Sequence, residues 1–100
     1  MKYEKLIRDK IPEIIRSKGG KPVVRLAGND EYHNHLRLKL QEEVTEFLRD
    51  DNPEELADIM EVILAICDEK GFSRAELELV RQQKATEKGR FTDKIILEEA

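Results

Sequence analysis

The sequence predicts an all-α fold, a four-helix bundle-like domain with short extended segments at both ends. Three observations predict it: apolar residues recur at helical spacing, glycines stand where helices would end, and capping residues precede the main apolar segments. The chain has 100 residues, which suits one small domain, 1–100, and 39% of them are hydrophobic. A domain of this size buries only about two-thirds of the surface of its unfolded chain, so we expect association with a second copy to complete the fold.

Two helices joined by an extended connector are expected in the first half of the chain. The first helix spans about residues 9–17, tolerates Pro12 in its first turn and stops before Gly19-Gly20. Residues 21–27 have the composition of an extended connector. A long second helix then reaches about residue 49, with Asn29 or Asp30 as its cap.

Two further helices are expected in the second half. Asp50-Asp51-Asn52 is a tight turn, and Asn52 caps a third helix that has Pro53 at its first position and ends near residue 70. Ser73-Arg74-Ala75-Glu76 is typical of a capping box for a fourth helix that ends near Gly89. Residues 90–97 are expected to be extended and docked on the bundle, because they contain the β-branched pair Ile95-Ile96.

Apolar stripes on the two long helices predict the core. On the second helix the stripe consists of Leu36, Leu40, Val44, Phe47 and Leu48. On the third helix it consists of Leu56, Ile59, Met60, Ile63, Ile66 and Cys67. Cys67 is the one cysteine of the chain, so we interpret it as a small core residue rather than a nucleophile or a disulfide partner. Apolar residues off these stripes are expected at an oligomer interface: Leu38, Leu64 and Leu79.

Composition and charge exclude several classes of protein. The chain has 18 Lys and Arg against 22 Asp and Glu, a net charge of −4, whereas general nucleic-acid binders have a basic excess. No apolar run approaches the roughly 18–20 residues that span a bilayer, and no apolar stretch typical of a signal peptide follows Met1. We therefore expect a cytoplasmic protein without a membrane or nucleic-acid partner.

Two pairs of acidic residues border the predicted core. Glu43 and Glu46 lie along the edge of the stripe on the second helix, and Glu55 and Asp58 lie one turn apart on the flank of the third. Because residues 50–52 are too few to do more than reverse the chain, the two helices should pack antiparallel, with both pairs at matching heights. Converging carboxylates repel unless a cation neutralises them, and a site with oxygen ligands only suits Mg²⁺.

The same residues also have a simpler interpretation. Glu55 stands three residues after Asn52, where a carboxylate serves a capping box, and Asp58 is favoured electrostatically near a helix N-terminus. In that case the chain is a non-enzymatic helical homodimer that binds a protein or a nucleotide. His33 and His35 are two residues apart and point to different helix faces, so we do not expect them to hold a metal.

The acidic residues also belong to a recognisable signature. Glu42-Glu43-Val44-Thr45-Glu46 followed by Glu55-Leu56-Ala57-Asp58 resembles the EExxE…ExxD pattern of the all-α nucleoside triphosphate pyrophosphohydrolases, the MazG-like superfamily. That superfamily includes the dimeric dUTPases and the phosphoribosyl-ATP pyrophosphohydrolases. Residues 3–12, residues 54–62 and the closing Lys88-Gly89-Arg90-Phe91 are similar to small, uncharacterised members of the phosphoribosyl-ATP pyrophosphohydrolase type. The resemblance spans nearly the whole chain and implies a MazG-type fold.

The resemblance implies a reaction and a set of site residues. In such enzymes Mg²⁺, or Mn²⁺ in its place, bridges the acids and the substrate's phosphates while water attacks the α-phosphorus of a nucleotide, which releases pyrophosphate and a nucleoside monophosphate. The metal ligands would be Glu43, Glu46, Glu55 and Asp58. The catalytic group would be Glu42, Glu43 and Glu46, with Glu42 or Glu46 orienting or deprotonating the water.

The resemblance also gives expectations about substrate and assembly. Cations near both ends of the chain are the candidates for binding phosphate: Arg8, Lys10, Lys84, Lys88 and Arg90. Members of this kind are homodimers or tetramers, and a role in clearing non-canonical or excess nucleotides is suggested. The identity of the nucleotide stays open, because the chain lacks the additional helices that build a nucleobase pocket in larger members.

Overall fold

The computed structural model describes residues 4–100, which form four α-helices and no strand, as the sequence predicts. The helices are α1 (Ile11–Ser17), α2 (Asn29–Asp50), α3 (Pro53–Lys70) and α4 (Arg74–Lys88). Tyr3, which opens the N-terminal stretch of the resemblance, lies outside the described residues. In the part of the chain that the structure describes, no helix has both the length and the apolar character needed to span a membrane.

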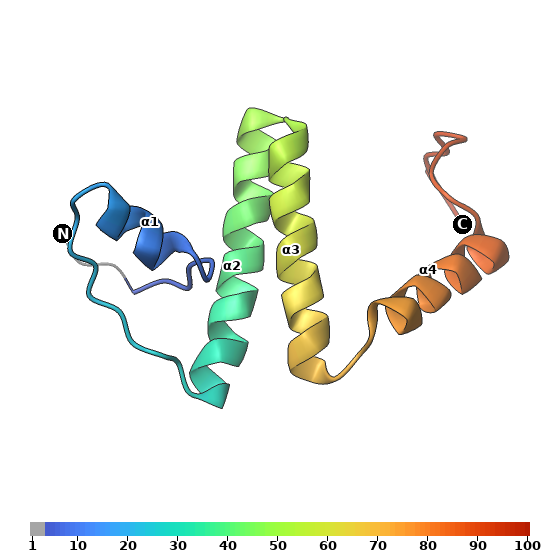
Figure 1. Ribbon diagram of the computed structural model, residues 1–100. Helices are drawn as coiled ribbons and strands as arrows, with labels where there is room; N and C mark the ends of the chain where they lie inside the picture. The colour runs from blue at the N-terminus through green and yellow to red at the C-terminus, as the bar shows by residue number, and fades with distance from the viewer. Residues whose placement is uncertain (1–3) are drawn as a thin grey trace.

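An antiparallel hairpin of α2 and α3 stands at the centre of the molecule (Figure 1). Asp51 reverses the chain in the left-handed conformation, with φ of 53°. Asn52 then caps α3, because its Oδ1 accepts a hydrogen bond of 3.0 Å from the backbone N–H of Glu55. The predicted turn, cap and antiparallel packing are therefore confirmed.

Two predicted helix starts are wrong by a small margin. α1 begins at Ile11 rather than near Asp9. The cap of α2 is Gly28 rather than Asn29 or Asp30, because the extended backbone of Gly28 presents its carbonyl to the N–H of Tyr32 at 2.9 Å. A helix can begin without a side-chain cap when its first N–H groups face solvent.

The last helix follows its prediction. Ser73 caps α4, since its Oγ accepts a hydrogen bond of 3.0 Å from the N–H of Glu76. The helix ends at Lys88, next to Gly89, which has a φ of 81° that favours glycine.

The core is thin and lies along the seam between α2 and α3. Leu36, Glu43, Val62 and Cys67 are the buried residues of the described chain, which confirms Cys67 as a core residue. The predicted stripes are only partly covered. One part is half-buried, namely Leu40, Phe47, Ile59 and Ile66. The other part is exposed, namely Val44, Leu48, Leu56, Met60 and Ile63. One neighbouring helix covers only a narrow face, so the broad predicted stripe extends beyond the seam.

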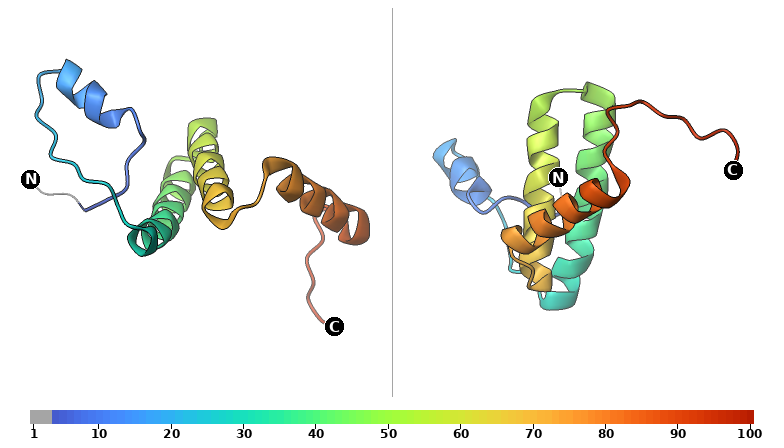
Figure 2. Two further views of the ribbon diagram at one scale, coloured as in Figure 1. Left: turned by 60° about the horizontal axis from the view of Figure 1, so that its bottom comes forward. Right: turned by 90° about the vertical axis from the view of Figure 1, so that its right-hand side faces the viewer.

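The outer helices lie on opposite sides of the hairpin, α1 on the side of α2 and α4 on the side of α3 (Figure 1), and Figure 2 shows both standing away from it. In the described part of one chain, α2 and α3 are the only helices that pack along their length. The predicted docking of residues 90–97 is wrong, because α4 carries this segment away from the hairpin and Phe91 and Ile95 are 98% and 81% exposed. The radius of gyration is 17.7 Å, whereas a compact domain of this length has about 13 Å.

Candidate metal centre

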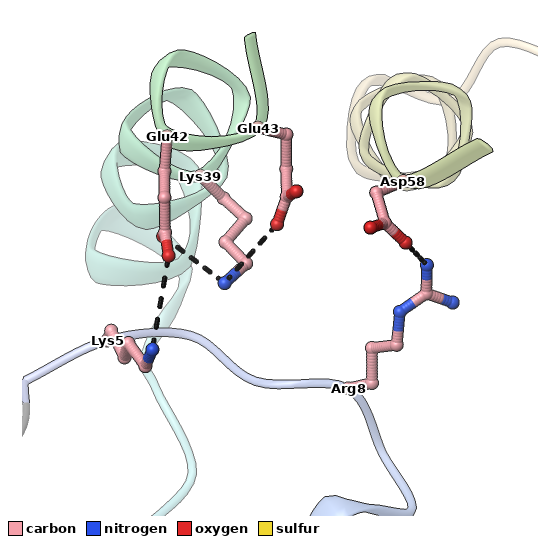
Figure 3. Close-up of polar contacts among 6 residues, drawn as sticks. All are labelled: Lys5, Arg8, Lys39, Glu42, Glu43 and Asp58. Carbon is pink, nitrogen blue, oxygen red and sulfur yellow. Dashed lines mark hydrogen bonds and ion pairs between the residues drawn. The ribbon is translucent and has the colours of Figure 1, made fainter. Parts of the chain in front are cut away.

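Three carboxylates from α2 and α3 meet across the seam. One oxygen from each of Glu43, Glu55 and Asp58 lies within 4.8 Å of the other two. Glu55 and Asp58 come from the first two turns of α3, and Val62, on the same face one turn later, is buried. This face of α3 therefore points into the hairpin, where it meets Glu43 from α2 (Figure 3). Of the four acids expected to converge, three lie together, and Glu46 lies outside this set although its charge acts on both Glu43 and Glu55.

Two oxygens of this acidic cluster, defined as Glu43, Glu55 and Asp58, are buried and have no hydrogen-bond partner among residues 4–100. They are Oε2 of Glu43 and Oε2 of Glu55, and Glu43 as a whole is only 8% exposed. Burial raises the pKa of both carboxyl groups above the ordinary value, and the nearby Glu46 raises it further. An unsatisfied buried carboxylate is costly, so these atoms are chemically suited to a cation.

The position of the Glu55 carboxylate distinguishes a role in capping α3 from a role in the acidic cluster. A complete capping box needs a hydrogen bond from the N–H of Asn52 back to the side chain of Glu55. In residues 4–100 the two residues are joined only by the bond from Glu55 N–H to Asn52 Oδ1. The Glu55 carboxylate instead faces the acidic cluster, with Oε2 unpartnered. Its side chain is therefore not needed for capping.

Lys39 supplies a positive charge from within α2. Its Nζ lies 3.2 Å from Oε2 of Glu42 and 3.7 Å from Oε1 of Glu43 (Figure 3). The sequence-based reasoning missed Lys39. The signal was available, because a lysine three and four residues before two glutamates lies on their side of a helix.

The N-terminal segment, residues 4–8, supplies two more charges. Lys5 Nζ lies 3.9 Å from Oε1 of Glu42, and Arg8 Nη2 donates to Oδ1 of Asp58 at 2.7 Å (Figure 3). Leu6 and Ile7 between them are half-buried. Arg8, predicted to bind phosphate, is thus held by a predicted metal ligand, and no local sequence pattern indicates that contact.

The other predicted phosphate-binding cations are not brought to the acidic cluster within one chain. Lys10 is exposed at the start of α1. Lys84 and Lys88 lie on α4 and Arg90 follows it, and this helix leads away from the hairpin (Figure 1). None of the ion pairs found among residues 4–100 joins these four cations to Glu43, Glu55 or Asp58.

The far end of the hairpin carries a separate polar cluster. His33 Nδ1 lies 3.1 Å from Oε2 of Glu69, and Arg37 Nη1 donates to Oε1 of Glu69 at 3.2 Å. These contacts hold the pKa of Glu69 below its ordinary value. Within the described residues, neither His33 nor His35 belongs to a group of potential metal ligands. The cluster therefore ties the two helices together.

Comparisons with known proteins give no activity. No family model matches the chain, and no solved structure matches it. An uncharacterised protein of Mycolicibacterium smegmatis is 54% identical over 41 residues, which are 41% of this chain. The match covers 42% of that relative, so the chain spans less than half of the relative's length.

Proposed function

We propose that the chain is a metal-dependent nucleoside triphosphate pyrophosphohydrolase of the MazG-like kind, which cleaves the α–β phosphoanhydride to give a nucleoside monophosphate and pyrophosphate. The observation that carries this proposal is the acidic cluster: three carboxylate oxygens within 4.8 Å, from two facing helices. Two of its residues have buried oxygens without a partner. The resemblance of the EExxE…ExxD segments to these hydrolases supports the choice of reaction.

Glu43, Glu55 and Asp58 are the residues that would hold the cation. Carboxylate oxygens without histidine or cysteine fit a hard ion, which favours Mg²⁺, with Mn²⁺ as a substitute. When bound, the ion neutralises phosphate charge and activates water at neutral pH. Glu43 fixes the position of the site, since it is buried and approached by Lys39 from one turn earlier on α2.

Glu46 is better placed than Glu42 to orient the attacking water. Glu42 is held by Lys39 at 3.2 Å and by Lys5 at 3.9 Å. Glu46 is half-buried beside Glu43 and Glu55, and none of the ion pairs of the described residues involves it. Glu42 is thus engaged by two lysines, whereas Glu46 adjoins two of the residues that would hold the ion. We therefore assign water orientation to Glu46 and a supporting role to Glu42.

Self-association belongs to this proposal, because a single chain leaves much surface uncovered. The chain exposes 9168 Å², whereas a compact protein of this mass exposes about 5,900 Å². Leu48 and Met60, on the outer faces of α2 and α3, are 75% and 62% exposed. An excess of about 3,000 Å² per chain suits the large interfaces of obligate homodimers. A second copy, as a dimer or within a tetramer, would complete the MazG-type bundle and supply the cations of α4.

The proposed reaction is tested with a panel of nucleoside triphosphates, Mg²⁺ and ¹⁸O-labelled water. Attack at the α-phosphorus places the label in the monophosphate and releases unlabelled pyrophosphate. Asp58→Asn should remove the activity, while Glu61→Gln, which changes an exposed carboxylate of α3, should not. Release of orthophosphate together with a nucleoside diphosphate would contradict the proposal.

The competing function is a non-enzymatic homodimer that binds a protein or a nucleotide. The exposed apolar faces of α2 and α3 favour association but suit both functions equally. The two differ in their response to metal: the binding module predicts that Mg²⁺ leaves thermal stability unchanged, and the hydrolase predicts an increase that depends on Asp58.

A further inference from the structure

Arg8 connects the N-terminal segment to the acidic cluster. Its Nη2 donates to Oδ1 of Asp58 at 2.7 Å, while the side chains of Arg8 and Asp58 remain 56% and 38% exposed. Among residues 4–100, Asp58 is thereby the one member of the cluster that forms an ion pair with an arginine. Figure 3 shows the Arg8 guanidinium between Asp58 and the N-terminal segment, whereas Oε2 of Glu43 and Oε2 of Glu55 are buried.

A divalent cation and this guanidinium compete for the same carboxylate. A cation held among three oxygens that lie within 4.8 Å of one another lies close to the group paired with Asp58. The cation and the Arg8 guanidinium repel each other at such a separation, and the Asp58 carboxylate is attracted more strongly to the divalent cation. Metal binding therefore weakens the Arg8–Asp58 pair.

Release of Arg8 leaves its guanidinium near the cluster. Residues 4–8 run beside α2 and α3 (Figure 3), Leu6 and Ile7 within this segment are half-buried, and the Arg8 side chain is exposed, so a movement of that side chain alone is enough to release it. A guanidinium offers a planar fork of donors that matches phosphate oxygens. Lys39 differs, since its side chain is only 18% exposed and pairs with both Glu42 and Glu43, so it remains an internal counter-charge.

We propose that Arg8 is a metal-gated anion receptor: it closes the metal-free cluster by pairing with Asp58, and a divalent cation frees it to bind a phosphate group. This inference rests on the proposed function, because it requires the cluster to bind metal. It adds that metal and phosphate bind cooperatively through a residue of the N-terminal segment. Coupling of this kind is reciprocal, so phosphate also strengthens metal binding.

The experiment measures the affinity for Mn²⁺ alone, by electron paramagnetic resonance, and the affinity for inorganic pyrophosphate at saturating Mn²⁺, by calorimetry. Arg8→Gln removes the competitor, so Mn²⁺ alone should bind about fivefold to tenfold tighter, and pyrophosphate should bind weaker by a similar factor. Arg8→Lys keeps the charge but loses the fork, so Mn²⁺ affinity should stay near that of the wild type while pyrophosphate affinity falls. Arg16→Gln, an exposed charge on α1, is the matched control.

The outcomes separate the two proposals. If Mn²⁺ binds the wild type but binds Arg8→Gln no more tightly than Arg16→Gln, the gating by Arg8 is overturned and the metal site stands. Unchanged pyrophosphate affinity in Arg8→Gln also overturns the gating. If Mn²⁺ binds neither the wild type nor Asp58→Asn, the proposed function fails and the gating fails with it.

Discussion

Replacing Glu43 by glutamine should stabilise the metal-free protein and remove its response to metal. Glu43 is 8% exposed, its Oε2 has no hydrogen-bond partner, and burial is the main cause of its raised pKa. The substitution keeps the size of the side chain and deletes the buried negative charge. The stability of the metal-free protein should therefore increase while its metal affinity decreases. A general packing defect would lower both.

The size of the stability change follows from the charges around Glu43, some of which repel it and one of which attracts it. At an effective dielectric constant of about 20, a carboxylate within 4.8 Å of Glu43, such as Asp58, repels it by about 3.5 kcal/mol or more, a figure that solvent and Arg8 reduce. Lys39, at 3.7 Å, attracts Glu43 by about 4.5 kcal/mol in the same terms. The repulsion from Glu55 and Asp58 together at least offsets the attraction of Lys39, and the burial of the charge remains, which costs about 1 kcal/mol or more. Glu43→Gln should thus raise the melting temperature by about 4–8 °C.

The assay is thermal unfolding followed by circular dichroism, with and without Mg²⁺. At a free metal concentration of about 100 times Kd, the wild type should gain about 2.7 kcal/mol of stability, and Glu43→Gln should gain almost none. Glu61→Gln, an exposed position on α3, should keep both the wild-type melting temperature and the metal response. A melting temperature for Glu43→Gln below that of the wild type, or an intact metal response, would refute this account of Glu43.

Three further predictions test the cap, the far end of the hairpin and the exposed face. Asn52→Ala removes the cap of α3, so it should lower the free energy of unfolding by about 1 kcal/mol and leave the metal affinity unchanged. Glu55→Gln should lower the metal affinity without lowering the free energy of unfolding. Denaturant unfolding measures the stability of both variants, and Mn²⁺ titration measures their metal affinity. The pKa of Glu69 is lower in the folded state than its ordinary value of about 4.3, so its stabilising effect is present at neutral pH and is lost as the pH falls through and below that value. Glu69→Gln should therefore lower the melting temperature at pH 6 by a few degrees and leave it unchanged near pH 2. Met60→Lys places a charge on an exposed apolar face and should shift the mass measured by light scattering towards the monomer, with an unchanged mass excluding this face from the interface.

The helices could be predicted because their signals are local. Asn52, Ser73 and Gly89 mark the helix ends in the sequence, and each performs the predicted part in the structure. The convergence of Glu43 with Asp58 was also predictable, because a turn as short as residues 50–52 allows only an antiparallel hairpin. Periodicity and turn length are therefore enough to predict the hairpin of α2 and α3.

The remaining features depend on partners that periodicity does not identify. Met60 lies on the apolar stripe that predicts the core, yet it is 62% exposed. Helical spacing shows that a face is apolar, but it does not show which element covers that face. Arg8 meets Asp58 although the two are far apart in sequence, so no spacing rule applies. The β-branched tail residues predict a docked segment, yet Phe91 is 98% exposed in one chain, because the composition of a segment does not say which surface covers it.

The open shape of the chain and its buried carboxylates have a common physical basis. A two-helix seam is too narrow to bury many apolar side chains, and in this seam a glutamate takes a position that a leucine would fill more favourably. The hairpin is therefore weak by itself, and both of the proposed additions strengthen it: a cation satisfies the unpartnered oxygens of Glu43 and Glu55, and a second copy covers Leu48 and Met60. Each addition holds α2 and α3 in the same antiparallel arrangement, so each lowers the cost of the other. Metal affinity should consequently increase with protein concentration across the range in which the chain associates.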